Sequence, residues 1–226
     1  MGETMYIEDY YGWSTHQPLL KALLKTFSPK FILELGVGLH STPIFIDYNP
    51  EELMCIENDN EWLNKIKNQC GFKKEHTIIF HDLGCDVNLQ TFLNQLNIEQ
   101  KIGIIDYYKK LSDLIQSKTE YPKLMFVDNF TCCRSSAINT LYKNFDIIVY
   151  HDCEPVGIDW YEYYFVDDLK NKFNSYKLKS QANWTGCFIK KSLNQDELDQ
   201  NILPYINEYR INNKLHNDKI YLEKEY

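Results

Sequence analysis

Short apolar runs alternate with amphipathic stretches along most of the chain. The runs at residues 31–35 (FILEL) and 52–57 (ELMCIE) are mostly hydrophobic and only a few residues long. Runs of this kind are typical of strands that are buried on both faces of a sheet. The pattern predicts strands at residues 31–35, 52–57, 76–82, 124–128, 145–152, 176–180 and 186–191.

Between these runs, hydrophobic residues recur at helical spacing. Residues 19–27 place leucines and a phenylalanine on one helical face, with Ser14 or Thr15 as the N-cap and Pro29 at the end. Further helices are predicted at residues 42–48, 58–70, 135–142 and 161–173, with two more within residues 86–120.

The order of these elements predicts the fold class. Strands and helices alternate from residue 31 to about residue 173, which indicates a parallel, doubly wound sheet. The last two strands are too close together for a crossover helix, so we expect them to form an antiparallel hairpin at one edge. The prediction is an α/β fold with a doubly wound, mostly parallel, seven-stranded sheet and a C-terminal hairpin.

A length of 226 residues fits one well-cored domain. Within it we expect an N-terminal lid and helix at residues 1–29, a core at residues 30–191 and a helical appendix at residues 192–226. The mixed charges of the appendix indicate that most of it is solvated, although it could contribute to a homo-oligomer.

Composition and charge limit the kinds of molecule that this chain is expected to bind and the compartment in which it is expected. A net charge of -8 argues against binding of a nucleic-acid backbone, and an apolar fraction of 44% excludes a disordered chain. The seven cysteines form no C-x-x-C pair and match no zinc spacing, and no secretory signal or membrane-length apolar run is present. These features predict a cytoplasmic protein of a reducing compartment, with neither a nucleic acid nor a membrane as its partner.

The segment at residues 34–41, ELGVGLHS, is expected to form a ligand-binding turn between a strand and a helix. Gly36 permits a sharp turn, and Gly38 lets a ligand approach the backbone. Ser41 stands where a dinucleotide fingerprint would have its third glycine, and it is a good N-cap instead.

Two acidic residues follow at the ends of the next strands. Glu57 lies 19 residues after Gly38, where a carboxylate can accept both ribose hydroxyls of a nucleoside. The alternative is that Glu57 caps the helix that begins at Asn58. Asp82 ends the third predicted strand and could bind an adenine amino group, or it could be an exposed acid of a turn.

Glu34 gives information about the charge of the ligand. A carboxylate before the glycine turn would repel a pyrophosphate but attract a cation such as S-adenosylmethionine (SAM). With Gly36, Gly38, Glu57 and Asp82, it makes the chain resemble the class I SAM-dependent methyltransferases over roughly residues 31–190. The resemblance implies SAM as cofactor, with an N-terminal segment that folds over its pocket. The cofactor-binding residues predicted in this way are Glu34, Gly36, Gly38, Ser41, Glu57, Asp82 and Asp128.

Asp128, His151 and Asp152 end the fourth and fifth predicted strands and are the candidate catalytic residues. A hydroxyl acceptor needs a base or a metal ion, because it is protonated at neutral pH. Asp128 and Asp152, with Asn129 or His151, could hold Mg²⁺ or another divalent cation, or His151 could act as a general base. The alternative is that His151 and Asp152 cap the strand and fix the next loop.

A second resemblance concerns the C-terminal half. This half is similar to the glucuronoxylan-type polysaccharide O-methyltransferases in four features. They are the VDNF segment at residues 127–130, Arg134, the strand that ends in His-Asp and the aromatic run at residues 160–165. The resemblance implies a sugar, glycan or other small hydroxylated acceptor. The predicted substrate contacts are His16, Arg134 and Tyr161, with capping or a surface position as the alternative for His16 and packing as the alternative for Tyr161.

Other functions are weighed against this one. An N- or carboxyl-methyltransferase of a small molecule is the alternative within the enzymes. An NAD(P)-dependent sugar reductase or epimerase would need a Y-x-x-x-K dyad and a third glycine, which are absent from the sequence. The set of acids and glycines argues against a non-catalytic interaction protein, and the net charge argues against an RNA methyltransferase. We therefore predict a SAM-dependent O-methyltransferase.

Overall fold

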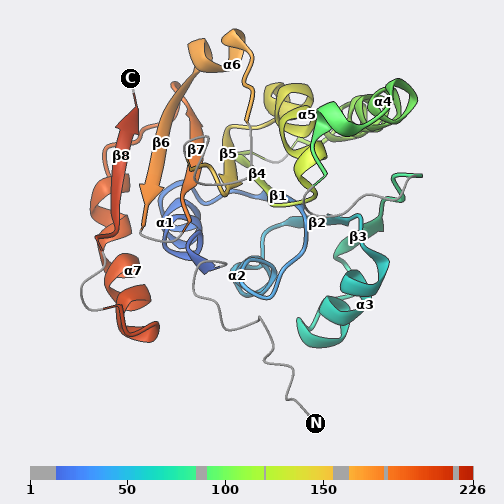
Figure 1. Cartoon of the computed structure of the whole chain (residues 1–226). Helices are drawn as coiled ribbons and strands as arrows, with labels where there is room; N and C mark the ends of the chain where they lie inside the picture. Colours follow the sequence, from blue (N-terminus) through green and yellow to red (C-terminus); the bar gives the residue numbers. More distant parts are fainter. Residues whose placement is uncertain are drawn as a thin grey trace.

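One sheet forms the centre of the molecule (Figure 1). The computed structural model describes residues 14–84, 91–119, 121–154, 163–180, 183–215 and 219–225, and within these ranges eight strands pair in the order β3-β2-β1-β4-β5-β7-β6-β8. The strands are β1 (Phe31–Leu35), β2 (Glu52–Glu57), β3 (Thr77–Phe80), β4 (Lys123–Val127), β5 (Ile147–His151), β6 (Phe173–Lys179), β7 (Thr185–Lys190) and β8 (Tyr221–Glu225).

The pairing confirms the predicted fold class. Strands β1 to β5 are parallel, whereas β7 pairs antiparallel with both β5 and β6. The sequence prediction of seven strands was wrong by one, because β8 pairs antiparallel with β6 at the edge. The strand order reverses between β1 and β4, and open α/β sheets bind ligands at such a point.

Helices cover both faces of this sheet (Figure 1). Helices α1, α2, α3 and α7 lie on one face, and α4, α5 and α6 lie on the other. No helix in the described ranges is both long and apolar enough to span a membrane. The helices are α1 (Gln17–Phe27), α2 (Thr42–Tyr48), α3 (Asn60–Gln69), η3 (Leu93–Gln95), α4 (Ile98–Gln116), α5 (Thr131–Leu141), η4 (Tyr142–Asn144), α6 (Asp167–Lys172) and α7 (Leu198–Asn212).

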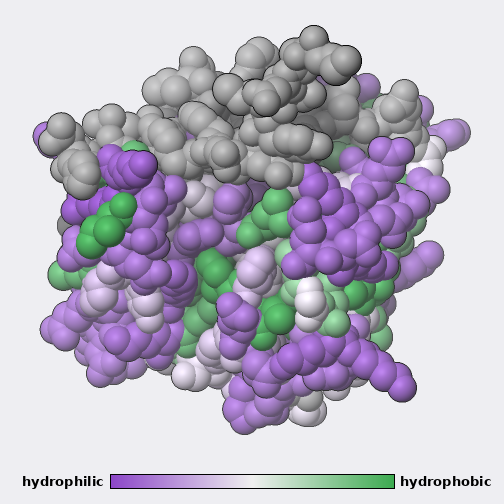
Figure 2. Space-filling view, turned by 90° about the horizontal axis from the view of Figure 1, so that it is seen from below, coloured by the Kyte–Doolittle hydropathy of each residue, from purple (hydrophilic) through white to green (hydrophobic). Residues whose placement is uncertain are grey.

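The apolar runs of the sequence become strands that are buried on both sides. Ile32 and Phe126 point into the core under α1, whereas Leu33 and Met125 point into the core under α4 and α5. This follows from the alternation of side chains along a strand. The face in Figure 2 is mostly hydrophilic, with apolar side chains confined to smaller areas between the polar ones.

The C-terminal appendix differs from its prediction. Helix α7 was expected to be mostly solvated, but Leu198, Ile202 and Ile206 are buried in the core beside α1. The polar strand β8 carries no apolar alternation that would have revealed it. It is joined to β6 by ion pairs of Lys177 with Glu225 and of Lys179 with Glu223, at 2.7 and 2.5 Å.

The helix predicted at residues 161–173 is also shorter than expected. Helix α6 begins only at Asp167, and residues 155–162 lie outside the described ranges. Tyr163 and Phe165 precede it in irregular backbone and pack against the ring of Tyr150, at centroid distances of 5.0 and 5.1 Å. The aromatic contacts to β5 therefore replace the expected first turns of the helix.

Candidate active site

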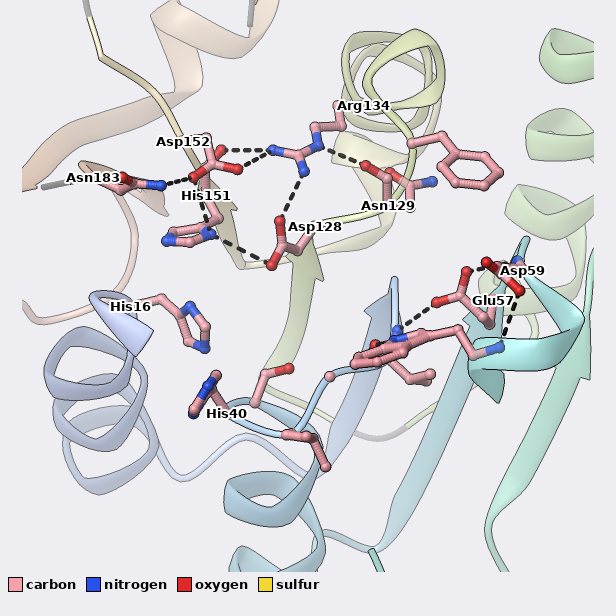
Figure 3. A pocket seen from close by; sticks show the side chains of 16 residues that line it. His16, His40, Glu57, Asp59, Asp128, Asn129, Arg134, His151, Asp152 and Asn183 are labelled. Atoms are coloured by element: carbon pink, nitrogen blue, oxygen red, sulfur yellow. Dashed lines mark hydrogen bonds and ion pairs between the residues drawn. The ribbon is translucent and has the colours of Figure 1, made fainter. Parts of the chain in front are cut away.

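A cavity of about 450 Å³ lies at the carboxyl ends of the parallel strands (Figure 3). Its volume falls within the roughly 300–1,000 Å³ of small-molecule sites. One end is formed by the loop after β1 and the end of β2, and the other by the ends of β4 and β5. The lining residues are His16, Val37, Gly38, Leu39, His40, Ser41, Glu57, Asp59, Trp62, Asp128, Asn129, Phe130, Arg134, His151, Asp152 and Asn183.

Gly36 allows the loop after β1 to lie directly against the turn after β4. Its φ of +86° is in the left-handed region, and a Cβ there would overlap the carbonyl of Asp128 and lie 2.6 Å from the amide nitrogen of Asn129. Gly36 is therefore required by the close approach of two protein loops, and its predicted direct role toward the cofactor becomes a positioning role.

The first three amides of this loop are already engaged by the protein. The N–H groups of Gly36, Val37 and Gly38 donate to the carbonyl of Ile56 at 2.9 Å, to Glu57 at 3.0 Å and to Thr42 Oγ1 at 2.9 Å. A dinucleotide-binding turn instead directs free N–H groups at a pyrophosphate. This loop therefore suits a ligand without phosphate.

Glu34 does not line the cavity, which corrects its predicted contact with the cofactor. Its side chain is fully buried and accepts hydrogen bonds from Ser41 Oγ at 2.7 Å, from Thr42 Oγ1 at 2.9 Å and from Cys55 Sγ at 3.2 Å. Burial raises the pKa of Glu34 to about 8, so the carboxyl is largely neutral at pH 7. It acts on the ligand only by fixing the loop, in which Ser41 does line the cavity.

Glu57 lines the cavity where the prediction placed it. One oxygen accepts the amides of Asn58 at 2.6 Å and Asp59 at 2.8 Å, and the other accepts the amide of Val37. Burial raises its pKa to about 7, against the effect of these backbone hydrogen bonds. Glu57 thus fixes the start of α3, and its second oxygen lies beside the loop, while its contact with a ribose stays a prediction.

Sequence reasoning missed two residues near Glu57. Asp59 is the N-cap of α3 and accepts the amide of Trp62 at 3.0 Å. The indole of Trp62 donates to the carbonyl of Val37 at 2.6 Å, so it holds the loop after β1 from the side. The N-cap was readable from the sequence, but the contact between the indole and the loop was not.

Asp82 does not reach the cavity, which corrects its predicted contact with adenine. Strand β3 ends at Phe80, and Asp82 is exposed and accepts the amide of Gly84 at 2.8 Å. The alternative reading, an acid of an exposed turn, is the one that the structure supports.

Asp128, His151 and Asp152 come together at the other end of the cavity, as predicted (Figure 3). The guanidinium of Arg134 donates to Asp128 Oδ1 at 2.8 Å and to Asp152 Oδ2 at 3.0 Å, and Asn183 donates to Asp152 Oδ1 at 2.5 Å. Arg134 was predicted to contact substrate, but its side chain is only 5% exposed and binds these carboxylates instead. Asn183 comes from the turn before β7, and no local signal in the sequence revealed it.

His151 lies between both carboxylates. Its Nδ1 is 3.4 Å from Asp128 Oδ2 and 3.3 Å from Asp152 Oδ1. Burial alone would lower the pKa of His151, but the charges of Asp152 and Asp128 raise it to about 9. Although burial acts in the opposite direction, His151 and Arg134 lower the pKa of Asp152. The cluster therefore favours a positive charge at the position of His151.

His16 completes this end of the cavity. It occupies the N-cap position of α1 without a capping hydrogen bond, and it is 2% exposed. Burial and the nearby His151 lower the pKa of His16 to about 3, so its ring is neutral. Ser14 and Thr15, the predicted caps of α1, contact the hydroxyl of Tyr209 and Nε2 of His151 instead, both at 3.0 Å.

Two further predictions concern ligands of this cluster. The predicted substrate contact Tyr161 lies outside the described residues. Within the described residues, the side chains close enough to share one metal ion are those of His16, Asp128 and His151. Asp152, predicted as a metal ligand with Asp128, is not in this group.

Comparisons with known proteins give matches at the level of the fold. No protein-family model matches the chain, and no curated protein matches it either. Among solved structures, the chain is similar to the N-methyltransferase NodS from Bradyrhizobium japonicum WM9. The identity is 11%, the match covers 80% of this chain and 96% of that one, and the TM-score is 0.49.

Two other solved structures are also similar. Human methyltransferase-like protein 13, in complex with SAH, shows 15% identity over 88% of this chain and 89% of its own, with a TM-score of 0.44. The methyltransferase domain of bacterial CtHen1-CN shows 7% identity over 79% and 99%, with a TM-score of 0.41. At such identities and TM-scores these likenesses carry no function across, and the function proposed below rests on the site.

Proposed function

We propose that this chain is a SAM-dependent methyltransferase that methylates a hydroxyl group of a sugar, a glycan or another small acceptor. The observation that carries the proposal is the single cavity that joins the loop after β1 and Glu57 to the cluster of Asp128, His151 and Asp152. One end suits a nucleoside without phosphates, and the other presents groups that can act on a hydroxyl.

The first end fits SAM by its chemistry. Glu57 offers an oxygen beside the loop for a ribose hydroxyl, and Gly38 leaves the adjoining wall without a side chain. The engaged amides of the loop disfavour the pyrophosphate of NAD(P), which weakens the reductase alternative. Bound SAM supplies a methyl group that is activated by its positively charged sulfur.

The second end acts on the acceptor. Asp128 is 25% exposed, more than Arg134 or Asp152, so it is the carboxylate placed to meet an acceptor. It can take the hydroxyl proton as the oxygen forms its bond to the methyl carbon, or it can hold a divalent cation such as Mg²⁺ that binds the acceptor oxygen. Arg134 and Asn183 fix the orientation of the carboxylates.

The acceptor class follows from the charge of the walls. The described lining includes the acids Glu57, Asp59, Asp128 and Asp152 against the cationic Arg134 and His151, which leaves the walls net negative. Such walls suit a neutral hydroxylated molecule better than a phosphorylated acceptor or a nucleic acid. The resemblance of residues 127–165 to polysaccharide O-methyltransferases supports a sugar or glycan.

The compartment is part of this proposal. Cys132 and Cys133 lie side by side with their sulfur atoms 3.7 Å apart, and the cysteines of the described residues are free thiols. Free thiols suit the reducing cytoplasm, where a small-molecule acceptor would be met.

Isothermal titration calorimetry tests the cofactor. S-adenosylhomocysteine should bind and NADH should not. The Glu57→Gln variant should weaken binding about 10- to 100-fold, as expected for loss of a hydrogen bond to a charged group. The exposed Glu61 gives the matched control Glu61→Gln, which should bind as wild type does. Binding of NADH without S-adenosylhomocysteine would refute the methyltransferase proposal.

Methyl-labelled SAM tests the acceptor. After incubation with saccharides, amines and carboxylic acids, the label should appear on a hydroxyl oxygen. Label found only on nitrogen or on a carboxylate would establish the N- or carboxyl-methyltransferase alternative instead.

A further inference from the structure

Three side chains from distant parts of the chain meet at the acceptor end of the cavity (Figure 3). His16 precedes α1, Asp128 follows β4 and His151 ends β5, and each offers one ligand atom within 4.8 Å of the others. The two imidazole rings lie 4.7 Å apart at an interplanar angle of 85°. Two imidazoles that bind one ion at about 2.1 Å and at roughly a right angle would place their centres about 4.5 Å apart.

His16 is the side chain that this arrangement explains. Within the described residues, neither of its buried ring nitrogens makes a well-formed hydrogen bond, and the one polar contact that acts on the ring is a weak one to the backbone of His40. Its ring packs against Phe126 at 5.0 Å and against His151, and neither contact satisfies a nitrogen. Buried polar groups are nearly always paired, so a buried imidazole that lines a cavity without a well-formed hydrogen bond points to a ligand.

The neighbours of His151 and Asp128 leave the appropriate atoms available. Nε2 of His151 contacts the hydroxyl of Thr15 at 3.0 Å, while Nδ1 faces Asp128 Oδ2 at 3.4 Å and Asp152 Oδ1 at 3.3 Å. Arg134 donates to Oδ1 of Asp128, which leaves Oδ2 on the side of the histidines. Metal-bound histidines usually hold their second nitrogen in this way, and such contacts fix the ring and its tautomer.

We propose that His16, Asp128 and His151 bind one divalent transition-metal ion. Two imidazole nitrogens and one carboxylate oxygen favour Mn²⁺, Fe²⁺, Co²⁺, Ni²⁺ or Zn²⁺ over Mg²⁺, which prefers oxygen ligands. Three protein ligands also leave coordination positions for oxygens of an acceptor. The site therefore differs in ligands and in metal from the Asp128–Asp152 magnesium site that the sequence predicted.

Asp152 supports the metal without binding it. Its two oxygens accept hydrogen bonds from Asn183 and Arg134. When the histidines are neutral, the carboxylates of Asp128 and Asp152 and the guanidinium of Arg134 together carry one net negative charge, which favours a cation. The proposal that this site binds a metal does not depend on methyl transfer. A role of the metal at an acceptor hydroxyl, in contrast, rests on the proposed function.

Cobalt titration of the full-length, metal-free chain tests the site without SAM or acceptor. Co²⁺ should bind one ion per chain and produce visible absorption bands of a site with nitrogen and oxygen ligands. The His16→Gln variant should lower the affinity at least tenfold, and excess Mg²⁺ should not displace Co²⁺. His76 lies before β3 and outside the lining of the cavity, so His76→Gln is the matched control and should leave binding unchanged.

The outcomes separate this proposal from the proposed function. Absence of Co²⁺ binding, equal binding by the wild type and the His16→Gln and His151→Gln variants, or displacement by comparable Mg²⁺ would overturn it. Circular dichroism and S-adenosylhomocysteine calorimetry on the same variants show whether they are folded. Binding of S-adenosylhomocysteine without Co²⁺ binding would be consistent with the methyltransferase proposal and would refute the metal site. Binding of Co²⁺ without S-adenosylhomocysteine binding would support the metal site and contradict the methyltransferase proposal.

Discussion

Arg134 organises the acceptor end of the site at the scale of a single residue. One buried guanidinium contacts Asp128, Asp152 and the backbone carbonyl of Asn129. It offsets the repulsion between two carboxylates that share one wall of the cavity. Its loss would remove one of the two cationic partners of these carboxylates, of which Asp152 is buried and Asp128 is partly exposed.

Arg134→Met should therefore lower the free energy of unfolding by about 3–5 kcal/mol, the typical effect of breaking a buried ion pair. Lys172 forms an exposed ion pair with Asp168 and gives the control Lys172→Met, for which we expect a loss below about 1 kcal/mol. Urea unfolding measures both. Equal losses for the two variants would show that Arg134 does not hold the carboxylates together.

Glu34 should make stability depend on pH. Because burial raises its pKa from 4.5 to about 8, its contribution to stability is complete below pH 4.5 and is lost as the pH rises through 8. Between pH 5 and 8 we expect wild type to lose up to about 1.4 kcal/mol per pH unit relative to Glu34→Gln. Urea unfolding across this range measures the difference.

Exposed Glu75 provides the control for that series, because Glu75→Gln should follow the pH dependence of wild type. A constant difference between wild type and Glu34→Gln from pH 5 to 8 would mean that Glu34 titrates normally.

At the scale of elements, the loop between β1 and α2 is held by the turn after β4. Gly36→Ala should cost about 1–2 kcal/mol for its left-handed backbone, plus the displacement of Asp128, and should abolish S-adenosylhomocysteine binding. Gly71 has a φ of +62° with nothing near its absent Cβ, so Gly71→Ala should show the backbone effect alone. Calorimetry and urea unfolding test both variants, and unimpaired binding by Gly36→Ala would contradict the close approach.

Most helices and strands could be predicted because local hydrophobic patterns in the sequence reflect their burial. The run at residues 31–35 is apolar because both of its faces are covered, and α2 begins at Thr42 with Pro43 in its first turn. Strand β8 could not be predicted, because an exposed edge held by ion pairs has no hydrophobic period. The helix expected at residues 161–173 forms only at Asp167–Lys172, because Tyr163 packs against β5 in irregular backbone before it.

The site was predictable where a residue ends a strand. Glu57, Asp128 and His151 line the cavity because parallel strands end at one edge. The prediction for Asp82 was wrong because β3 ends two residues before it, so Asp82 does not stand at a strand end. The burial of His16 beside His151 could not be foreseen, because it depends on contacts between residues far apart in the sequence.

At the scale of the whole molecule, α7 closes the core that α1 begins. The two helices pack together, and Lys21 and Glu208 form an ion pair at 2.7 Å between them. Helix α7 therefore belongs to the same hydrophobic core as α1.

Ile206 and Ile211 lie on the same helix and test this point. Ile206 is buried, so Ile206→Ala should lower the free energy of unfolding by about 2–5 kcal/mol. Ile211 is 70% exposed, and Ile211→Ala should change it by no more than about 0.5 kcal/mol. Urea unfolding compares them, and similar effects would mean that α7 does not belong to the core.

The place of β7 between β5 and β6 has a consequence for synthesis of the chain. Strand β6 is made before β7 but joins the sheet only through it, and the free edge of β5 is covered by the same strand. A nascent chain that ends at Lys179 therefore carries an unpaired edge of β5 and an unpaired strand β6, and unpaired edges favour association with other chains. We expect ribosome-bound chains to resist proteolysis in β5 only after residues 185–190 have emerged, and protection at shorter lengths would contradict this order.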